Sequence, residues 1–369
     1  MDRCDVLIVG GGPAGSTAAW RLVRGGLDVV VIDRARFPRD KVCTGWITPG
    51  VVEALDLDLD EYEGSRTLQP ITGFRVGRLN GASRLTDFRR VVSYAILRSE
   101  FDAFLLARSR ARLRTGEPLR SLRRDGDGWV VNDTIRAAVV IGAGGHFCPV
   151  ARRLRGSARG EQVIVAEHAE YRPGPAALAS CPIAGDVPEL FFWPDLRGYG
   201  WCVRKGEHLS IGAGRLTRTG FPAALREFTG MLQARGLLGD AAPGPWKGHA
   251  YLLNRTSARP LCDDRVLLVG DAAGLAFAPS GEGILTAVES GRMAADVLLA
   301  SAPTWTRDRL WPYAAGVEAR YGPRGGTDLV ARLPALVRHA AARVLLASPW
   351  LTRRVILEDG FLHSPAQTT

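Results

Sequence analysis

Lysine is scarce in this chain of 369 residues, which carries only Lys41, Lys205 and Lys247 among its 48 basic side chains. The formal charge is nonetheless +10, because the other basic residues are arginines. No block of five or six like charges occurs, and no nucleic-acid-binding motif accompanies the charge. We therefore expect no nucleic-acid partner and interpret the charge as a solvated arginine-rich surface. An anionic substrate or a membrane surface stays open as an alternative.

Paired cysteine motifs and long apolar runs are also absent from the sequence. The six cysteines are scattered without a C-x-x-C pair, which fits neither a disulfide scaffold nor a zinc site, so we expect a reducing compartment and no metal. No run of about 18 apolar residues occurs, so a membrane span is not expected. The first apolar segment lacks the basic region and cleavage site of a signal peptide, which favours a cytoplasmic location.

The N-terminal segment has the pattern of a βαβ unit. A β-branched apolar run over 5–10 ends in glycine, helical spacing covers 16–24, and a second strand over 29–32 ends at Asp33. Parallel strands joined by a helix predict a doubly wound α/β sheet, whose ligands lie beyond the carboxyl ends of its strands.

Gly10, Gly12 and Gly15 form a G-x-G-x-x-G motif between this strand and this helix. The first glycine allows a tight turn, the second lets backbone N–H groups approach a pyrophosphate, and the third lets helix and strand pack closely. Because Asp33 follows at the end of the next strand, the motif predicts a dinucleotide site with the Asp33 carboxylate on a ribose.

A second glycine-rich segment covers residues 267–284. An apolar strand delivers Asp271 at its carboxyl end, within reach of the polyhydroxyl chain of a cofactor. A loop with Pro279, Gly281 and Gly283 then opens a helix over 283–300, whose N-terminus offers unpaired N–H groups and partial positive charge. Such a helix end favours the negative charge that a flavin gains on reduction.

The middle of the chain is typical of antiparallel sheet. Short segments with strand propensity alternate with Gly, Pro and Asp and cover 73–76, 129–131, 163–166, 190–193, 200–203 and 209–213. The apolar run 137–142 fits the first sheet instead, which makes the first domain discontinuous. We predict a cofactor-binding domain of residues 1–65, 94–158 and 255–303, a substrate domain of 66–93 and 159–254, and a C-terminal segment 304–369. The pattern of that segment predicts helices that are interrupted at Pro312, Pro323, Pro334 and Pro349.

The two glycine motifs and the segment 97–105 occur in the order and approximate spacing of FAD-dependent oxidoreductases with the aromatic-hydroxylase fold. Within that group the chain most resembles the geranylgeranyl reductase family. Two segments carry the narrower resemblance: 41–45, similar to a cysteine-glycine segment near the flavin, and 198–214, similar to a tyrosine and tryptophan strand. The resemblance spans 5–295. It implies a discontinuous Rossmann-like FAD-binding domain, an inserted and mainly antiparallel β-sheet substrate domain, and a helical C-terminal tail.

The resemblance also implies site residues. The expected FAD contacts are Gly10, Gly12, Pro13, Ala14, Gly15, Asp33, Arg34, Arg98, Gly270, Asp271, Gly281 and Gly283. Trp46, Tyr199 and Trp201 are expected to bind substrate, and Cys43, Tyr199 and Glu282 are the candidate catalytic residues. From the residues alone, a lone cysteine more often packs inertly and an aromatic pair in a strand is more often core. No general acid or base stands out, and His146 is a further candidate.

One departure from the family pattern concerns the electron donor. Gly144 stands where relatives carry the aspartate of an Ala-Asp-Gly that is associated with FAD and reduced nicotinamide. No second G-x-G-x-x-G follows a strand and opens a helix, so we expect no separate nicotinamide domain. The donor therefore stays open between NAD(P)H and a reduced redox protein.

The leading hypothesis is an FAD-dependent reductase that moves a hydride from reduced flavin to a carbon-carbon double bond of an apolar substrate, isoprenoid-like or another secondary metabolite. A monooxygenase of the same fold is the alternative. A non-catalytic FAD-binding electron carrier that contacts a membrane through the arginine-rich tail 340–354 is a third. A halogenase is disfavoured, because those enzymes need a lysine relay and no lysine lies between Lys41 and Lys205.

Overall fold

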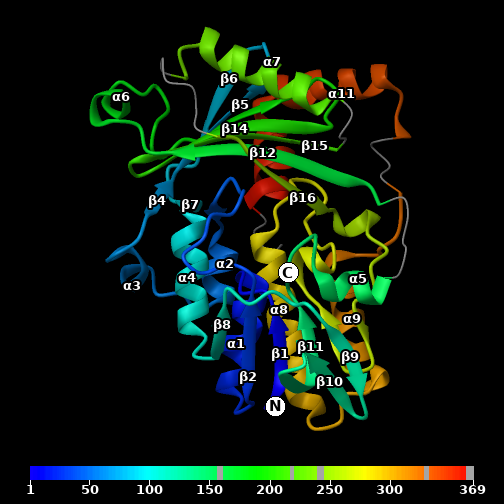
Figure 1. The fold of residues 1–369 in the computed structure, drawn as a ribbon. Helices are drawn as coiled ribbons and strands as arrows, with labels where there is room; N and C mark the ends of the chain where they lie inside the picture. Colours follow the sequence, from blue (N-terminus) through cyan, green and yellow to red (C-terminus); the bar gives the residue numbers. More distant parts are fainter. Residues whose placement is uncertain (156–160, 217–219, 239–244, 328–331, 363–369) are drawn as a thin grey trace. The chain divides into compact units, whose positions relative to one another are not determined.

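The computed structural model describes the chain except for residues 156–160, 217–219, 239–244, 328–331 and 363–369 (Figure 1). Its residues divide into two units, each packed mainly on itself. Unit 1 consists of 1–40, 99–162 and 251–327, and unit 2 consists of 41–98, 163–250 and 328–369. Residues 41–65, which the sequence assigns to the cofactor domain, therefore group with unit 2, and the C-terminal segment is divided between the units.

Unit 1 contains an eight-stranded sheet among its described residues, with the order β17-β18-β11-β1-β2-β8, in which β10 also pairs with β11 and β9 pairs with β10. The strands are β1 (Asp2–Val9), β2 (Val29–Asp33), β8 (Arg112–Thr115), β9 (Leu122–Asp125), β10 (Gly128–Val131), β11 (Ile135–Gly142), β17 (Cys262–Asp263) and β18 (Val266–Leu268). Strand β1 is parallel to both β2 and β11, which confirms the doubly wound α/β fold. The segment 129–131 is antiparallel as expected, but it belongs to this sheet, because β10 pairs with β11.

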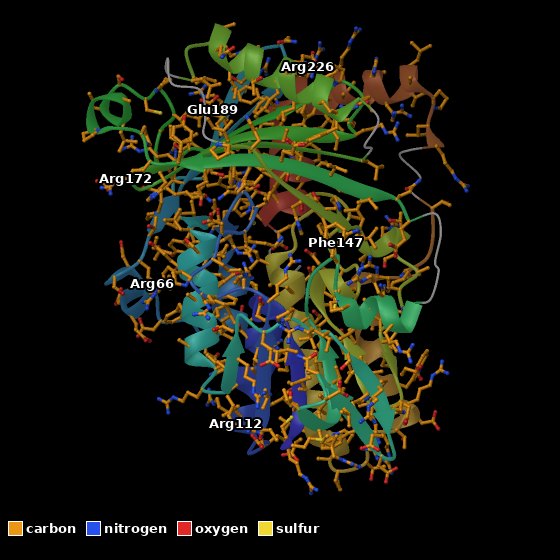
Figure 2. All side chains as sticks on the ribbon, in the orientation of Figure 1. Arg66, Arg112, Phe147, Arg172, Glu189 and Arg226 are labelled. Carbon is orange, nitrogen blue, oxygen red and sulfur yellow. The ribbon has the colours of Figure 1, made fainter. Side chains whose placement is uncertain are left out.

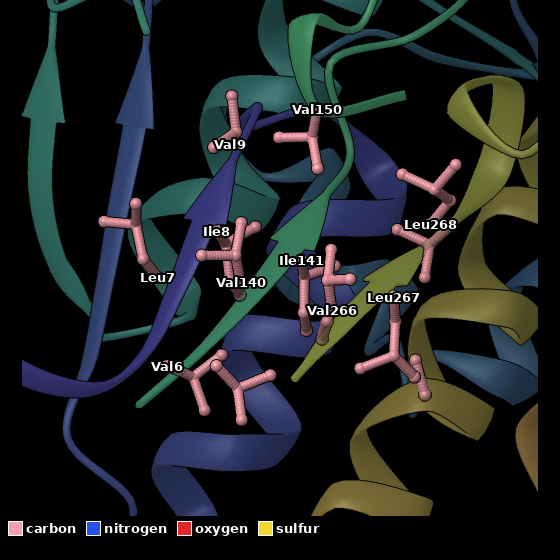
Figure 3. Close-up of a cluster of buried hydrophobic side chains, with 14 of the residues drawn as sticks. Val6, Leu7, Ile8, Val9, Val140, Ile141, Val150, Val266, Leu267 and Leu268 are labelled. Atoms are coloured by element: carbon pink, nitrogen blue, oxygen red, sulfur yellow. The ribbon is translucent and has the colours of Figure 1, made fainter. Parts of the chain in front are cut away.

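The core of unit 1 explains why these strands are apolar on both faces. Val6, Leu7 and Ile8 have no exposed surface, and Figure 3 shows Ile8 beside Val140 of the neighbouring strand β11. A parallel sheet covered by helices buries both faces, so its strands read as continuous apolar runs. The helical segments of unit 1 are α1 (Pro13–Arg24), α4 (Arg98–Arg108, which begins at the last residue of the first segment of unit 2), α5 (Pro149–Arg155), η1 (Asn254–Thr256), η2 (Gly270–Ala272), α8 (Ile284–Ser301) and α9 (Arg307–Tyr321).

The expected break at Pro312 is wrong, since Pro312 lies inside α9. Tertiary packing holds this helix together: Leu310, Tyr313 and Val317 are buried, and the Tyr313 hydroxyl donates to the Leu268 carbonyl at 2.7 Å. Those contacts offset the loss of stability caused by the backbone hydrogen bond that the proline nitrogen cannot donate.

Unit 2 contains a seven-stranded sheet with the order β16-β12-β15-β14-β13-β5-β6 and a three-stranded sheet with the order β3-β7-β4, within the described residues. The strands are β3 (Trp46–Ile47), β4 (Leu68–Ile71), β5 (Gly73–Arg78), β6 (Ser83–Asp87), β7 (Ser93–Ile96), β12 (Val163–Tyr171), β13 (Glu189–Phe192), β14 (Gly198–Lys205), β15 (His208–Arg215) and β16 (Lys247–Leu252). The pairs β12·β15, β14·β15, β13·β14 and β5·β6 are antiparallel. The mainly antiparallel sheet expected for this part of the chain is thereby confirmed.

The helical segments of unit 2 are α2 (Pro49–Ala54), α3 (Leu59–Glu63), α6 (Pro175–Ala179), α7 (Phe221–Ala234), α11 (Ala335–Ala347), α12 (Pro349–Leu351) and the π-helical η3 (Thr352–Leu362). The two faces of the large sheet differ, because side chains alternate along β14. An added Cβ at Gly200 would lie 2.5 Å from the Phe228 ring of α7, so Gly200 and Cys202 face α7. Tyr199 and Trp201 therefore lie on the opposite face.

The arginines of the chain are distributed over separate elements. Arg112 on β8, Arg172 after β12 and Arg226 on α7 are exposed and project outward (Figure 2). This distribution agrees with a solvated arginine-rich surface. Across the described part of the chain, no helix is both long and apolar enough to span a membrane.

Candidate active site

The first glycine turn of unit 1 leaves no room for side chains at two of its positions. Gly10 has a φ of +115°, and an added Cβ would lie 2.4 Å from the Ala143 carbonyl oxygen. At Gly15 an added Cβ would lie 1.9 Å from the Gly10 carbonyl oxygen. At Gly12, by contrast, the nearest atom to an added Cβ is Arg39 Nη2 at 3.5 Å, and no side chain caps the helix that begins there. The turn thus presents the N-terminal backbone N–H groups of α1 next to the Arg39 guanidinium, and this combination suits an anionic group.

Asp33 lies at the carboxyl end of β2 and stabilises this turn. Its Oδ2 accepts from the Gly11 N–H at 2.8 Å, and its Oδ1 accepts from the Ala35 N–H at 2.8 Å. Each carboxylate oxygen has a second lone pair, so both bonds are compatible with a ribose hydroxyl. The predicted ribose contact of Asp33 stays a prediction.

Arg39 is a candidate cofactor residue that the sequence does not reveal. Its Nη2 lies 3.0 Å from Oδ2 of the fully buried Asp102. Its Nη1 is buried and has no hydrogen-bond partner among the described residues. A buried unpaired guanidinium N–H beside Gly12 is unfavourable by itself and is satisfied by an anion bound at the turn. Nothing in the local sequence distinguishes Arg39 from the many other arginines, since its position depends on Asp102 in α4.

The second glycine segment packs directly on the first helix. An added Cβ at Gly270 would lie 3.1 Å from the Ala14 Cβ, and one at Gly291 would lie 2.4 Å from the Ala14 carbonyl oxygen. Oδ1 of Asp271 lies 3.4 Å from the Cβ position of Gly283, at the N-terminus of α8. The structure therefore brings the two predicted cofactor motifs together within unit 1.

Glu282 lies at the same end of α8. Its Oε1 accepts from the Leu285 N–H at 2.7 Å, and its buried Oε2 has no partner among the described residues. Burial raises the pKa of Glu282 to about 7, and the charges of Glu289 and Asp271 add to the effect. Near neutral pH this carboxyl is therefore poised to hold or release a proton.

The loop of Asp271 is held by a buried cation. Arg259 Nη1 donates to the carbonyl oxygens of His146 and Ala272 at 3.0 and 3.1 Å, and Arg259 Nε pairs with Glu161 at 2.9 Å. His146 thus contributes its backbone carbonyl to this support, and its Nδ1 lies 3.4 Å from Nη2 of Arg259. An added Cβ at Gly144 would lie 3.3 Å from Sγ of Cys148, so the aspartate of the family pattern would crowd Cys148 here.

The turn of Cys43 belongs to unit 2 and is packed on a buried ion pair. The Gly45 N–H donates to Cys43 Sγ at 3.3 Å. Gly45 has a φ of +72°, and an added Cβ would lie 2.3 Å from Lys205 Nζ. Lys205 is fully buried, and its Nζ lies 2.5 Å from Glu170 Oε2. The geometry of the Cys43 turn therefore depends on the Lys205 ammonium.

His168 lies on the same sheet face as Trp201, because both pair with Gly212 across β15. It forms a hydrogen bond with the Cys43 backbone, and its Nδ1 has no partner among the described residues. Burial lowers the pKa of His168 to about 4, with the charge of Lys205 adding to the effect. The imidazole is therefore neutral at pH 7.

An aromatic cluster covers this face of the sheet. The Tyr199 ring lies 6.0 Å from Trp201 and 5.1 Å from Phe361, and Phe361 lies 5.5 Å from Trp46. The structure thus groups the three predicted substrate residues, Trp46, Tyr199 and Trp201. It adds Phe361 and Phe192, whose rings lie 6.4 Å apart. The sequence does not reveal Phe361, because it comes from the C-terminal η3.

Comparison with known proteins shows the family of this chain. A family model described as "FAD dependent oxidoreductase" matches residues 5–91. The chain is 31% identical to geranylgeranyl diphosphate reductase of Rhodobacter capsulatus, over 81% of this chain and 75% of that protein. It is 30% identical to menaquinone reductase of Mycolicibacterium smegmatis, over 84% of this chain and 80% of that protein. The chain belongs to the geranylgeranyl reductase family of FAD-dependent oxidoreductases.

The fold of this geranylgeranyl reductase family member also matches a solved structure. The chain is similar to a geranylgeranyl bacteriochlorophyll reductase-like protein from Thermoplasma acidophilum, with a TM-score of 0.79 and 20% sequence identity. The match covers 98% of each of the two chains. That identity supports the fold alone. The expected discontinuous FAD-binding fold with an inserted β-sheet domain is confirmed.

FAD, the cofactor of the family, is thereby confirmed as the cofactor of this enzyme. The residues present fit its diphosphate: an added Cβ at Gly12 would meet no atom closer than 3.5 Å, α1 has no side-chain cap, and Arg39 has an unpaired N–H beside them. Of the other expected contacts, Arg98 is 7% exposed at the start of α4, whereas Arg34 is exposed on the loop after β2. The individual FAD contacts stay predictions.

Proposed function

We propose that this enzyme reduces carbon-carbon double bonds of an apolar, isoprenoid-like substrate held on the aromatic face of unit 2. The observation that carries the proposal is the cluster of Trp46, Tyr199, Trp201 and Phe361 on one sheet face, in which the partly exposed Tyr199 ring is backed by the three buried rings. Aromatic side chains offer an apolar wall to an extended hydrocarbon. The relatives named for reduction of geranylgeranyl diphosphate and of menaquinone support a reductase.

Saturating a double bond requires a hydride equivalent and a proton. FAD supplies the reducing equivalents when it is bound. The protein must supply the proton, and Glu282 is our proposed source because its pKa of about 7 keeps it partly protonated at neutral pH. In unit 2 the Cys43 thiol, held by the Gly45 N–H, and the Tyr199 hydroxyl orient the substrate and are the competing proton donors.

Gly144, which stands where the family pattern has an aspartate, bears on the identity of the electron donor. Because an aspartate is replaced by glycine there, we propose a reduced redox protein as the main donor, with NAD(P)H as the alternative. The six cysteines are all unpaired, which supports a reducing cytoplasmic location for this chemistry. Anaerobic reduction of the purified enzyme with NADH, NADPH and dithionite, followed by absorbance, separates the two donors.

The decisive experiment is anaerobic turnover of all-trans geranylgeranyl diphosphate with dithionite as reductant, followed by mass spectrometry of the product. The expected product has gained a pair of hydrogen atoms for each reduced double bond. A product that has gained oxygen in aerated buffer, with no hydrogenation under anaerobic conditions, would instead establish the monooxygenase. Tyr199→Ala is expected to slow turnover, and Phe228→Leu, on the α7 side of the same sheet, is the matched control.

A further inference from the structure

Helix α11 turns an apolar stripe toward solvent. Leu336 is 83% exposed, Val344 is 60% exposed, and Val337 is 47% exposed. Ala340 and Ala347 are exposed as well. At 3.6 residues per turn, these five positions fall within about 100° of one another around the helix axis. The stripe is therefore continuous along the helix, whereas Ala342 and Leu346 on another side are buried.

Exposed apolar side chains also occur in the segments on either side of α11 along the chain. Trp350 in α12 is 68% exposed, Val355 in η3 is 41% exposed, and Leu333 before α11 is 42% exposed. A large exposed apolar patch on a folded protein marks an interaction site rather than ordinary surface. A tryptophan at such a site is typical of membrane–water interfaces, where its ring lies at the level of the lipid headgroups.

Positive charge accompanies this surface. Residues 332–359 contain five arginines and two acidic residues, so this segment has a net charge of +3. Arg353 and Arg354 pair with Glu358, at 3.0 and 3.2 Å, whereas exposed Arg343 lies beside the apolar stripe. A second copy of this chain would bring the same positive charge against it, on a protein whose net charge is already +10. An anionic lipid surface offers the complementary charge.

We propose that the face formed by Leu336, Val337, Val344, Trp350 and Arg343 docks on an anionic membrane surface. The apolar side chains enter the boundary between headgroups and acyl chains, and Arg343 contacts lipid phosphates. This interaction does not depend on the proposed reaction, because no residue of the face belongs to the candidate active site.

The test is flotation of the full-length, FAD-loaded protein with phosphatidylcholine vesicles that do or do not contain phosphatidylglycerol. We expect the wild type to float with the anionic vesicles only, and less so in high salt. Leu336→Glu, Trp350→Glu and Arg343→Glu are each expected to weaken binding by about tenfold. Flavin absorbance and circular dichroism verify that each variant is folded.

Matched controls come from α9 in unit 1. Trp311 is 54% exposed and Arg309 is exposed, so Trp311→Glu and Arg309→Glu make the same chemical changes outside the proposed face. Both controls should float like the wild type. The proposal is overturned if the wild type does not bind anionic vesicles, or if Trp311→Glu loses as much binding as Trp350→Glu. A wild-type dimer that Trp350→Glu dissociates, without vesicle binding, would assign the face to a second copy.

Discussion

The Nζ atom of Lys205 lies 2.5 Å from Oε2 of Glu170, and the Lys205 side chain has no exposed surface. The same ammonium lies against Gly45, whose N–H donates to the sulfur of Cys43. The chain has three lysines and all belong to unit 2, where Lys41 also lies 2.7 Å from His249 Nε2. The rare residue is thus used where a compact buried cation must fit beside a tight turn.

Lys205→Met is expected to destabilise the protein by about 3–5 kcal/mol, because it leaves the Glu170 carboxylate without its buried partner. Urea denaturation followed by circular dichroism measures the change. The double variant Lys205→Met/Glu170→Gln should recover much of the loss. Arg172→Met, which breaks the exposed pair with Glu207, is the control and should cost less than about 1 kcal/mol. Equal effects of the two single variants would contradict the prediction.

Stability should depend on His168 in acid. Its folded pKa of about 4 lies below the ordinary value of 6.5, so the unfolded chain binds a proton that the folded protein excludes. The free energy of unfolding should therefore be highest above pH 6.5 and fall by about 3 kcal/mol as the pH drops toward 4. His168→Gln should remove this part of the pH dependence, whereas the exposed His339→Gln should not. Denaturation curves across pH 4–8 test both.

Arg39→Met should weaken FAD binding by about tenfold or more, because it removes a charged hydrogen-bond donor beside Gly12. Titration of the apoprotein with FAD, followed by flavin fluorescence, gives the dissociation constant. Arg36→Met changes an exposed arginine of the same loop and is the control. Identical affinities for the two variants would remove Arg39 from the cofactor site.

Glu282→Gln should change the pH profile of turnover. If Glu282 supplies the proton, the rate of the wild type should fall as the pH rises through about 7, where this carboxyl loses its proton. The variant should be slower at pH 6 and should lack this titration. A wild-type profile that is retained in Glu282→Gln would assign the proton to another group. Glu289→Gln, which removes a neighbouring charge, should shift the profile to lower pH instead.

The local motifs could be predicted from the sequence because their physics is local. A strand, a turn that only glycine fits, and a helix follow one another within residues 2–24, so hydrophobic pattern and glycine spacing are enough. Asp271 and Gly283 were predictable in the same way, since a strand end and a helix start bracket them. The interior position of Pro312 was not, because packing of Tyr313 on β18 overrides the propensity of the proline.

The sequence by itself determined the fold class, the cofactor class and which residues could carry the chemistry. Only the tertiary structure decided which distant side chains meet: Arg39 at Gly12, Lys205 at Gly45, and Phe361 at Tyr199. It also decided that the apolar stripe of α11 faces outward, which periodicity cannot reveal. The physical reason is that a helical or strand pattern specifies the spacing of side chains along one element, whereas burial and pairing depend on the neighbours that the folded chain supplies.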